Sequence, residues 1–138
     1  MFKLVKIEGS GTNHGEPIKI RTASGVTYKH GCPYVLIDGF LGLVEEGTVP
    51  THIVLENATG DEKDYILSYR ITDNMIFETK LIGNPSIVTV GCKYALSMDA
   101  DNIAAGITSS MANGVAILYE NNGAEESGDN VYIRFSPN

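Results

Sequence analysis

The stretch Gly31-Cys32-Pro33-Tyr34-Val35-Leu36 decides the fold, because the chain contains a second copy of it. Sixty positions later stands Gly91-Cys92-Lys93-Tyr94-Ala95-Leu96, with glycine, cysteine, tyrosine and leucine at identical spacing. The repeated positions are Gly31, Cys32, Tyr34 and Leu36 in the first copy and Gly91, Cys92, Tyr94 and Leu96 in the second. A catalytic cysteine is seldom needed twice at matching positions. We therefore interpret these residues as structural and expect them to mark where a strand of each copy runs into the core.

The similarity between the two halves continues beyond this motif at an offset of 64 positions. At that offset, residues 53–57, 61–62 and 69–71 align with residues 117–121, 125–126 and 133–135. Residues 77–83 also resemble residues 2–9, with one gap. A unit that cannot bury its own apolar face must pack against its twin. We therefore predict a single domain, residues 1–138, built from two similar β units at about 2–71 and 75–135.

The composition is that of a turn-rich globular β protein. Apolar residues make up 43% of the chain and charged residues 20%, which argues against a disordered tail. Fifteen glycines and an abundance of Val, Ile, Thr and Tyr favour strands and turns. Asp38-Gly39 is a hairpin turn signal between apolar runs. The predicted strands cover residues 2–8, 17–22, 26–29, 34–37, 40–44, 51–56, 65–71, 115–119 and 130–135, and residues 9–16 form a loop.

One stretch of the second half has helical spacing. Ile103, Ile107 and Met111 fall at i, i+4 and i+8, although Gly106 and the polar residues 108–110 weaken a helix there. The equivalent region of the first half contains a glycine and a proline, which would break a helix. We therefore favour strand or loop and predict an all-β fold, a compact β-barrel or β-sandwich with little or no helix.

The charge of the chain limits its partners. A net charge of −7 argues against nucleic-acid binding, where a basic face supplies most of the affinity. Residues 1–30 nevertheless carry +3, which leaves −10 for the remainder. This asymmetry is compatible with head-to-tail association, with docking onto an acidic surface, or with plain solvation. No apolar run reaches the roughly 20 residues that a bilayer requires. The N-terminus alternates apolar and charged residues, unlike a signal peptide, so we expect neither secretion nor a membrane partner.

No pattern of catalytic or metal-binding residues is present in the sequence. His14, His30 and His52 have no partner at metal-ligand spacing. The glycines at 9 and 11 are followed by a predicted strand instead of the helix that a nucleotide fingerprint needs. Residues 99–102 approach a calcium loop but lack its glycine and its distal glutamate. We therefore predict a protein that is not an enzyme, with no catalytic residues, no metal and no cofactor.

The two cysteines leave two interpretations open. In a chain without an export signal, they indicate thiols in a reducing compartment that act as small buried hydrophobes. Their matched positions would also allow a disulfide across a pseudo-twofold axis.

Several short segments are similar to those of small β proteins encoded among the head genes of tailed bacteriophages and prophages. They are the Val90-Gly91 step, the Asp38-Gly39 turn, residues 72–78 (TDNMIFE) and the closing strand 128–135 (GDNVYIRF). The resemblance implies a head decoration, or cement, protein that binds the outer surface of the capsid. Such a protein would bind the major capsid protein and would form a homo-oligomer (trimer or dimer). It would be made in the host bacterial cytoplasm and would then be located on the virion.

Two alternatives to a decoration protein remain. One is a tail or fibre module that binds a host carbohydrate or receptor. The other is a small glycan-cleaving enzyme on a β scaffold, which would need convergent carboxylates in a deep cleft.

We expect the contact surface where the two copies differ. Residues 21–29 are basic and have no counterpart in the second copy, and residues 39–43 are more apolar than residues 100–104. The candidate contact residues are Lys3, Lys6, Arg21, Lys29, Phe40 and Leu41.

Overall fold

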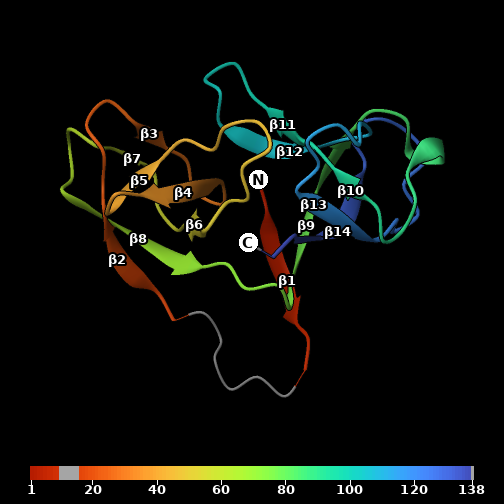
Figure 1. The fold of residues 1–138 in the computed structure, drawn as a ribbon, viewed down its shortest axis with the longest axis horizontal. Helices are drawn as coiled ribbons and strands as arrows, with labels where there is room; N and C mark the ends of the chain where they lie inside the picture. The colour runs from red at the N-terminus through yellow and green to blue at the C-terminus, as the bar shows by residue number, and fades with distance from the viewer. Residues whose placement is uncertain (10–15, 138) are drawn as a thin grey trace.

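The computed structural model describes residues 1–9 and 16–137 and shows an all-β protein. Its strands form two lobes, the first with β2 to β8 and the second with β9 to β14 (Figure 1). The predicted fold class, with two similar β units and little helix, is confirmed. The loop expected over residues 10–15, including His14, and the final residue Asn138 lie outside the described residues.

The first lobe is a small closed barrel. Its strands are hydrogen-bonded in the order β2 (Ile18–Arg21), β8 (Tyr65–Arg70), β6 (His52–Val54), β4 (Pro33–Ile37) and β5 (Phe40–Gly42). A parallel bridge between Thr22 and Leu41 joins β2 to β5 and closes the ring. A two-stranded ribbon, β3 (Thr27–Tyr28) with β7 (Ala58–Thr59), lies beside the barrel. Residues 58–59 lie outside the strands predicted from the sequence.

The second lobe repeats this arrangement. Its order is β10 (Lys93–Tyr94), β13 (Ala116–Glu120), β14 (Asn130–Phe135), β9 (Met75–Ile82), β12 (Ala104–Thr108) and β11 (Leu96–Met98). Only Ala95 separates β10 from β11, so together they correspond to β4 and close this barrel as well. The stretch with helical spacing forms β12, as favoured. A single 3₁₀ turn, Pro85–Ile87, follows β9 and is capped by the Asn84 side chain.

The duplication extends to individual hydrogen bonds. Gly31 N donates to Val54 O (2.9 Å) and Gly91 N to Leu118 O (2.8 Å). Both glycines have positive φ, +80° and +90°, a conformation that other L-residues adopt only under strain. The turn that starts the strand therefore explains why both copies have a glycine at this position.

The strand register corrects two details of the predicted alignment. His52 pairs with Arg70, and its equivalent Ala116 pairs with Phe135. The last strands are thus offset by 65 positions instead of 64, because the register of β13 with β14 shifts by one residue between Leu118 and Glu120. In addition, β9 occupies the place of β2, since β9 pairs with β14 as β2 pairs with β8. The alignment of residues 77–83 with residues 2–9 is therefore wrong.

Residues 2–9 belong to the sheet of the second barrel. The strand β1 (Lys3–Ile7) pairs antiparallel with β9, placing Leu4 opposite Phe77. The Phe2 ring lies 5.3 Å from that of Phe135, and Phe2 N donates to Gly31 O (2.7 Å). The first unit therefore begins at β2, and β1 connects the two barrels.

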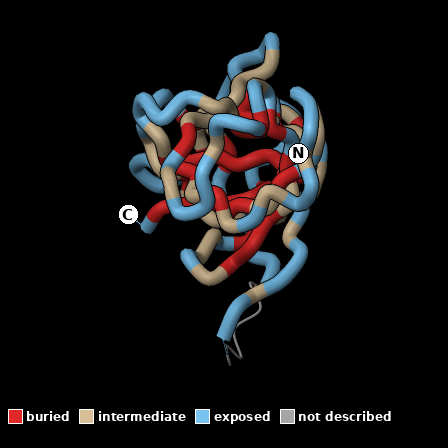
Figure 2. Tube along the Cα trace, turned by 90° about the vertical axis from the view of Figure 1, so that its right-hand side faces the viewer, coloured by how far each residue is buried: buried red, intermediate tan, exposed pale blue. Residues whose placement is uncertain are grey.

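Two clusters of buried side chains fill the barrels, and each cluster includes residues from the other lobe. Ile53 and Tyr69 of the first barrel pack into the core of the second. Ile103 of the second packs into the core of the first, beside Tyr34 and Leu41. Figure 2 shows the buried segments running through the middle of the molecule, with exposed loops around them. The lobes are thus held together by shared apolar burial.

Candidate partner-binding surface

The structure brings Arg21 and Phe40 together, two of the six candidate contact residues, and adds Tyr65. The Arg21 Cζ atom lies 5.6 Å from the centre of the Phe40 ring and 5.9 Å from that of Tyr65. Both rings are exposed, Phe40 at 42% and Tyr65 at 51%. We call Arg21, Phe40 and Tyr65 the arginine–aromatic cluster.

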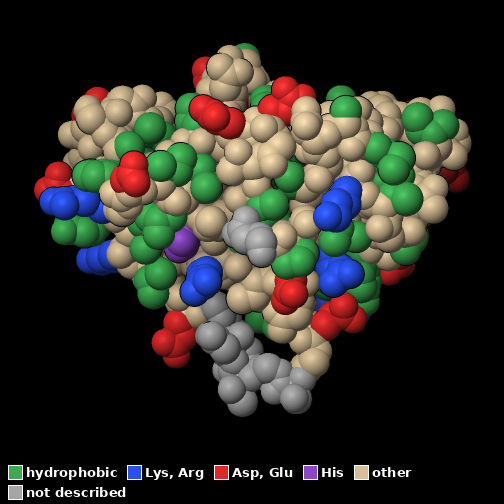
Figure 3. Space-filling model, viewed as in Figure 1, with side chains coloured by type: hydrophobic (Ala, Val, Ile, Leu, Met, Phe, Trp, Pro, Cys, Tyr) green, Lys and Arg blue, Asp and Glu red, His purple; other side chains and the backbone are tan. Residues whose placement is uncertain are grey.

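Local structure explains why these three side chains meet. Tyr65 is the cross-strand partner of Arg21, so both point to the same side of the sheet. The bridge between Thr22 and Leu41 sets the end of β2 against β5, whose first residue is Phe40. Figure 3 shows Lys and Arg side chains among hydrophobic ones at the edge of the first lobe. Tyr65 was not predicted, because β3 to β7 separate β2 from β8 in the chain and no local pattern indicates that these two strands pair.

The Arg21 guanidinium is open to an incoming group. Among the described residues it has no hydrogen bond or ion pair, and it lies over the Phe40 and Tyr65 rings. A guanidinium held this way presents its N–H groups in a fixed fork that suits a carboxylate. The cluster can therefore bury aromatic surface and pair with an acidic residue at once.

The second barrel has no equivalent of this cluster. By strand register, Lys80, Gly106 and Asn130 occupy the positions of Arg21, Phe40 and Tyr65. A Cβ on Gly106 would meet the Lys80 carbonyl oxygen at 2.6 Å, because β12 and β9 run side by side there. Tighter closure of the second barrel thus excludes an aromatic side chain at this point.

Two of the predicted contacts are engaged inside the molecule. Leu41 is fully buried in the first core, so its assignment as a contact residue is wrong. Lys29 Nζ reaches across to the second lobe and pairs with Asp99 (2.9 Å) and Asp101 (3.0 Å). These bonds raise the pKa of Lys29, and the bond to Lys29 lowers the pKa of Asp99.

The same contacts occupy the stretch that resembled a calcium loop. Asp99 Oδ1 accepts from the backbone N–H groups of Asp101 (2.8 Å) and Ile103 (3.0 Å), while Oδ2 binds Lys29. In residues 1–9 and 16–137, no group of three or more His, Cys, Asp or Glu side chains could hold a metal ion.

Lys3 and Lys6 lie on β1, in the sheet of the second barrel. Lys6 Nζ lies 4.9 Å from the centre of the Tyr119 ring, and interaction with the Tyr119 side chain raises the pKa of Lys6. Tyr119 in turn donates a hydrogen bond to Glu8 (3.0 Å). The two lysines therefore do not join the arginine–aromatic cluster, which comes from β2, β5 and β8.

The two cysteines and His52, whose side chains could be reactive, have structural roles instead. Cys32 is buried and Cys92 half-buried; both are free, so they form no disulfide. Burial raises the pKa of the Cys32 thiol, which disfavours the reactive thiolate. His52 is buried against the Thr51 hydroxyl (2.8 Å), and burial lowers its pKa.

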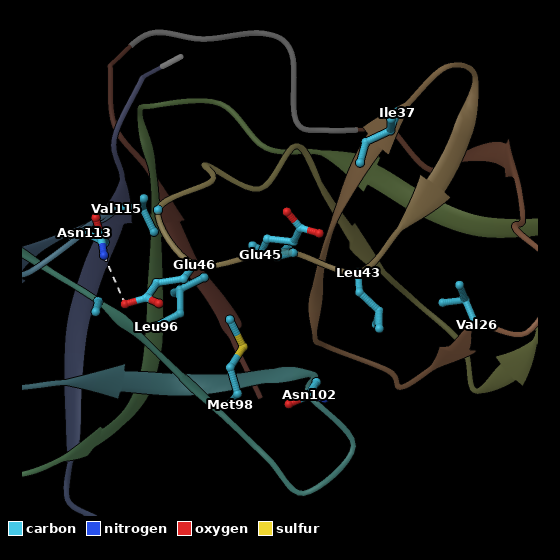
Figure 4. Close-up of a pocket in the computed structure, with 13 residues that line it drawn as sticks. Val26, Ile37, Leu43, Glu45, Glu46, Leu96, Met98, Asn102, Asn113 and Val115 are labelled. Atoms are coloured by element: carbon cyan, nitrogen blue, oxygen red, sulfur yellow. Dashed lines mark hydrogen bonds between the residues drawn. The ribbon is translucent and has the colours of Figure 1, made fainter.

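A cleft of about 720 Å³ lies between the two barrels. Its walls are mostly apolar, and Glu45, Glu46, Asn102 and Asn113 contribute the polar groups (Figure 4).

No protein-family model, curated protein or solved structure matches the chain. Within the part of the chain that the structure describes, no helix has the length and hydropathy to cross a membrane.

Proposed function

We propose that the protein is a head decoration protein of a tailed bacteriophage or prophage, non-enzymatic, which binds the outer surface of the capsid through Arg21, Phe40 and Tyr65. The observation that carries this proposal is the arginine–aromatic cluster itself. Arginine and aromatic residues are enriched in the cores of protein interfaces, where a few such side chains provide most of the binding energy. The resemblance of the sequence to decoration proteins supplies the partner, the major capsid protein.

The duplication supports the assignment of binding to this surface. Two barrels with the same hydrogen-bond pattern differ here, where the first has three exposed interacting side chains and the second has Gly106 between Lys80 and Asn130. The fold does not require two exposed aromatic rings beside an arginine here, and this composition is the one enriched in interface cores, which supports contact with a partner. The partner surface would offer an apolar patch beside a carboxylate.

The test uses heads assembled from the major capsid protein whose gene neighbours this one. Wild-type protein should co-sediment with these heads and raise their resistance to heat. Arg21→Glu and Tyr65→Ala should each weaken binding by a factor of roughly 30, the effect of losing about 2 kcal/mol at a hot spot. Lys80→Glu, the equivalent change on the second barrel, is the matched control. Absence of binding by the wild type, or equal losses in Arg21→Glu and Lys80→Glu, would refute the proposal.

A second candidate function is a tail or fibre module that binds a host carbohydrate or receptor. The exposed ring faces of Phe40 and Tyr65 favour it, because sugars stack on aromatic faces. A glycan array distinguishes the two: a decoration protein leaves it blank. The expected homo-oligomer is tested by the mass of the protein in solution.

A further inference from the structure

The cleft between the barrels has an apolar interior. The first barrel contributes Val26, Ile37 and Leu43, and the second contributes Leu96, Met98 and Val115. Figure 4 shows these side chains lying around one space, with the Glu45 and Glu46 carboxylates beside them. A volume of about 720 Å³ is in the range of pockets that hold a small ligand or a few side chains of a peptide.

The charge of the cleft is negative. Of the residues that the structure describes, Glu45 and Glu46 both line it, whereas no Lys or Arg does. Asn113 Nδ2 donates to Glu46 Oε1 (3.0 Å) and fixes that carboxylate against the second barrel. In the described residues the Glu45 side chain has no hydrogen bond or ion pair of its own. An apolar space with two carboxylates at its side is complementary to a cation carried on an apolar stem.

The duplication shows that these carboxylates are a local addition. Thr48 N donates to Glu45 O (3.0 Å) in one turn, and Gly114 N donates to Met111 O (3.2 Å) in the equivalent turn of the second barrel. Glu45 and Glu46 therefore correspond to Met111 and Ala112, which carry no charge. The two turns meet at the cleft, since a Cβ on Gly47 would lie 3.5 Å from that of Asn113. The turn works with or without acids, so the acids are not needed to form it.

We propose that this cleft binds a short segment of another protein in which an arginine or lysine is flanked by apolar residues. The apolar neighbours contact Leu43, Leu96 and Met98, and the cationic group pairs with Glu45 and Glu46. Arginine fits best, because its planar group can bind two carboxylate oxygens at once. The site is separate from the arginine–aromatic cluster, whose chemistry is the opposite, and it does not depend on capsid binding.

The test is a titration of the intact, ¹⁵N-labelled protein with the peptide acetyl-Leu-Arg-Leu-amide, followed by amide chemical shifts. We expect saturable shifts confined to residues 43–47, 95–98 and 113–115. The citrulline peptide, which has the same shape without the charge, should bind roughly five- to tenfold more weakly. Acetyl-Gly-Arg-Gly-amide should also bind more weakly, because it lacks the apolar neighbours.

Substitutions in the protein complete the test. Glu45→Gln and Glu46→Gln should each weaken the binding of the arginine peptide several-fold, while Glu125→Gln, in an exposed loop of the second barrel, leaves it unchanged. Glu45→Gln removes no hydrogen bond of the described structure, so its spectrum reports binding without a change of fold. The proposal is overturned if the arginine peptide does not bind, if it shifts residues elsewhere, or if the citrulline peptide or the Glu45→Gln protein binds as well as its charged counterpart.

Discussion

The buried hydroxyl of Tyr34 gives a quantitative test of the duplicated architecture. It accepts a hydrogen bond from Lys29 N (2.8 Å) and donates one to Thr27 O (3.0 Å). The equivalent Tyr94 hydroxyl accepts one bond, from Thr89 N (2.7 Å). Both rings are buried, so Phe at either position keeps the apolar contacts and removes the hydrogen bonds alone. At about 1 kcal/mol net for each bond, Tyr34→Phe should lower the free energy of unfolding by about 2 kcal/mol and Tyr94→Phe by about 1 kcal/mol.

Urea unfolding followed by far-ultraviolet circular dichroism measures both losses. Tyr65→Phe is the control, because Tyr65 is 51% exposed and its hydroxyl has no hydrogen bond in the described structure. Its free energy of unfolding should stay within about 0.5 kcal/mol of the wild type. Equal losses at Tyr34 and Tyr94, or a Tyr34→Phe loss no larger than that of the control, would refute the reasoning.

Three further predictions concern backbone geometry and pH. Gly91→Ala should lower the free energy of unfolding by about 1–2 kcal/mol through its positive φ alone. Gly31→Ala should lower it more, because its Cβ would also meet the N-terminal methionine side chain at 2.5 Å. Urea unfolding gives the order, and a smaller loss at Gly31 would contradict it. Gly106→Ala places a Cβ 2.6 Å from the backbone of β9 and should lower the free energy of unfolding by about 2 kcal/mol or more. Gly42→Ala, whose nearest atoms lie at 3.9 Å, should lower it by less than about 1 kcal/mol. Thermal unfolding compares the two variants, and equal losses would mean that the closure of the second barrel is unimportant for stability. Burial raises the pKa of Tyr69 to about 12, so its contribution to stability is complete below the unfolded-state pKa of about 10 and is lost as the pH rises towards 12. Tyr69→Phe should therefore make the decline of the free energy of unfolding between pH 10 and 11.5 shallower by about 1 kcal/mol per pH unit. An unchanged slope would contradict this.

The repeated motif was sufficient to predict two copies of one β unit, because its residues serve backbone geometry. A glycine at positive φ and a tyrosine that caps a backbone N–H are needed at one place in each barrel, so they remain visible in the sequence. The offset of the final strand was less visible. The extra residue lies within β13, where the register shifts between Leu118 and Glu120. A residue inserted within a strand as a bulge leaves no turn signal, so the sequence does not show where the offset changes from 64 to 65.

The strand β1 shows why local pattern does not assign a strand to a barrel. Residues 2–8 have the alternation of an amphipathic strand and were placed in the unit that follows them in the chain. Their pairing with β9 depends on contacts made 68 to 75 positions away, which alternation cannot encode. Sequence similarity between residues 2–9 and 77–83 reflects two strands that share one core.

The candidate surface was half predicted for a similar reason. Arg21 and Phe40 were identified because the copies differ there, and they meet in the structure. The sequence also points to Leu41, because residues 39–43 are more apolar than residues 100–104. The period of two in a strand, with Phe40 outward and Leu41 inward, would have separated them once the strand was accepted.

The position of β1 also has a consequence for how the protein is made. This strand precedes the first barrel in the chain, yet Lys3 pairs with Glu78, so its partner is synthesised only after the whole first barrel. Pairing over such a span slows folding, and until it happens β1 has an open edge that can join another nascent chain. It follows that no single cut between residues 70 and 75 yields two complete halves. The N-terminal fragment would carry a strand without its partner, and the C-terminal fragment would lack the strand that covers Met75 and Phe77.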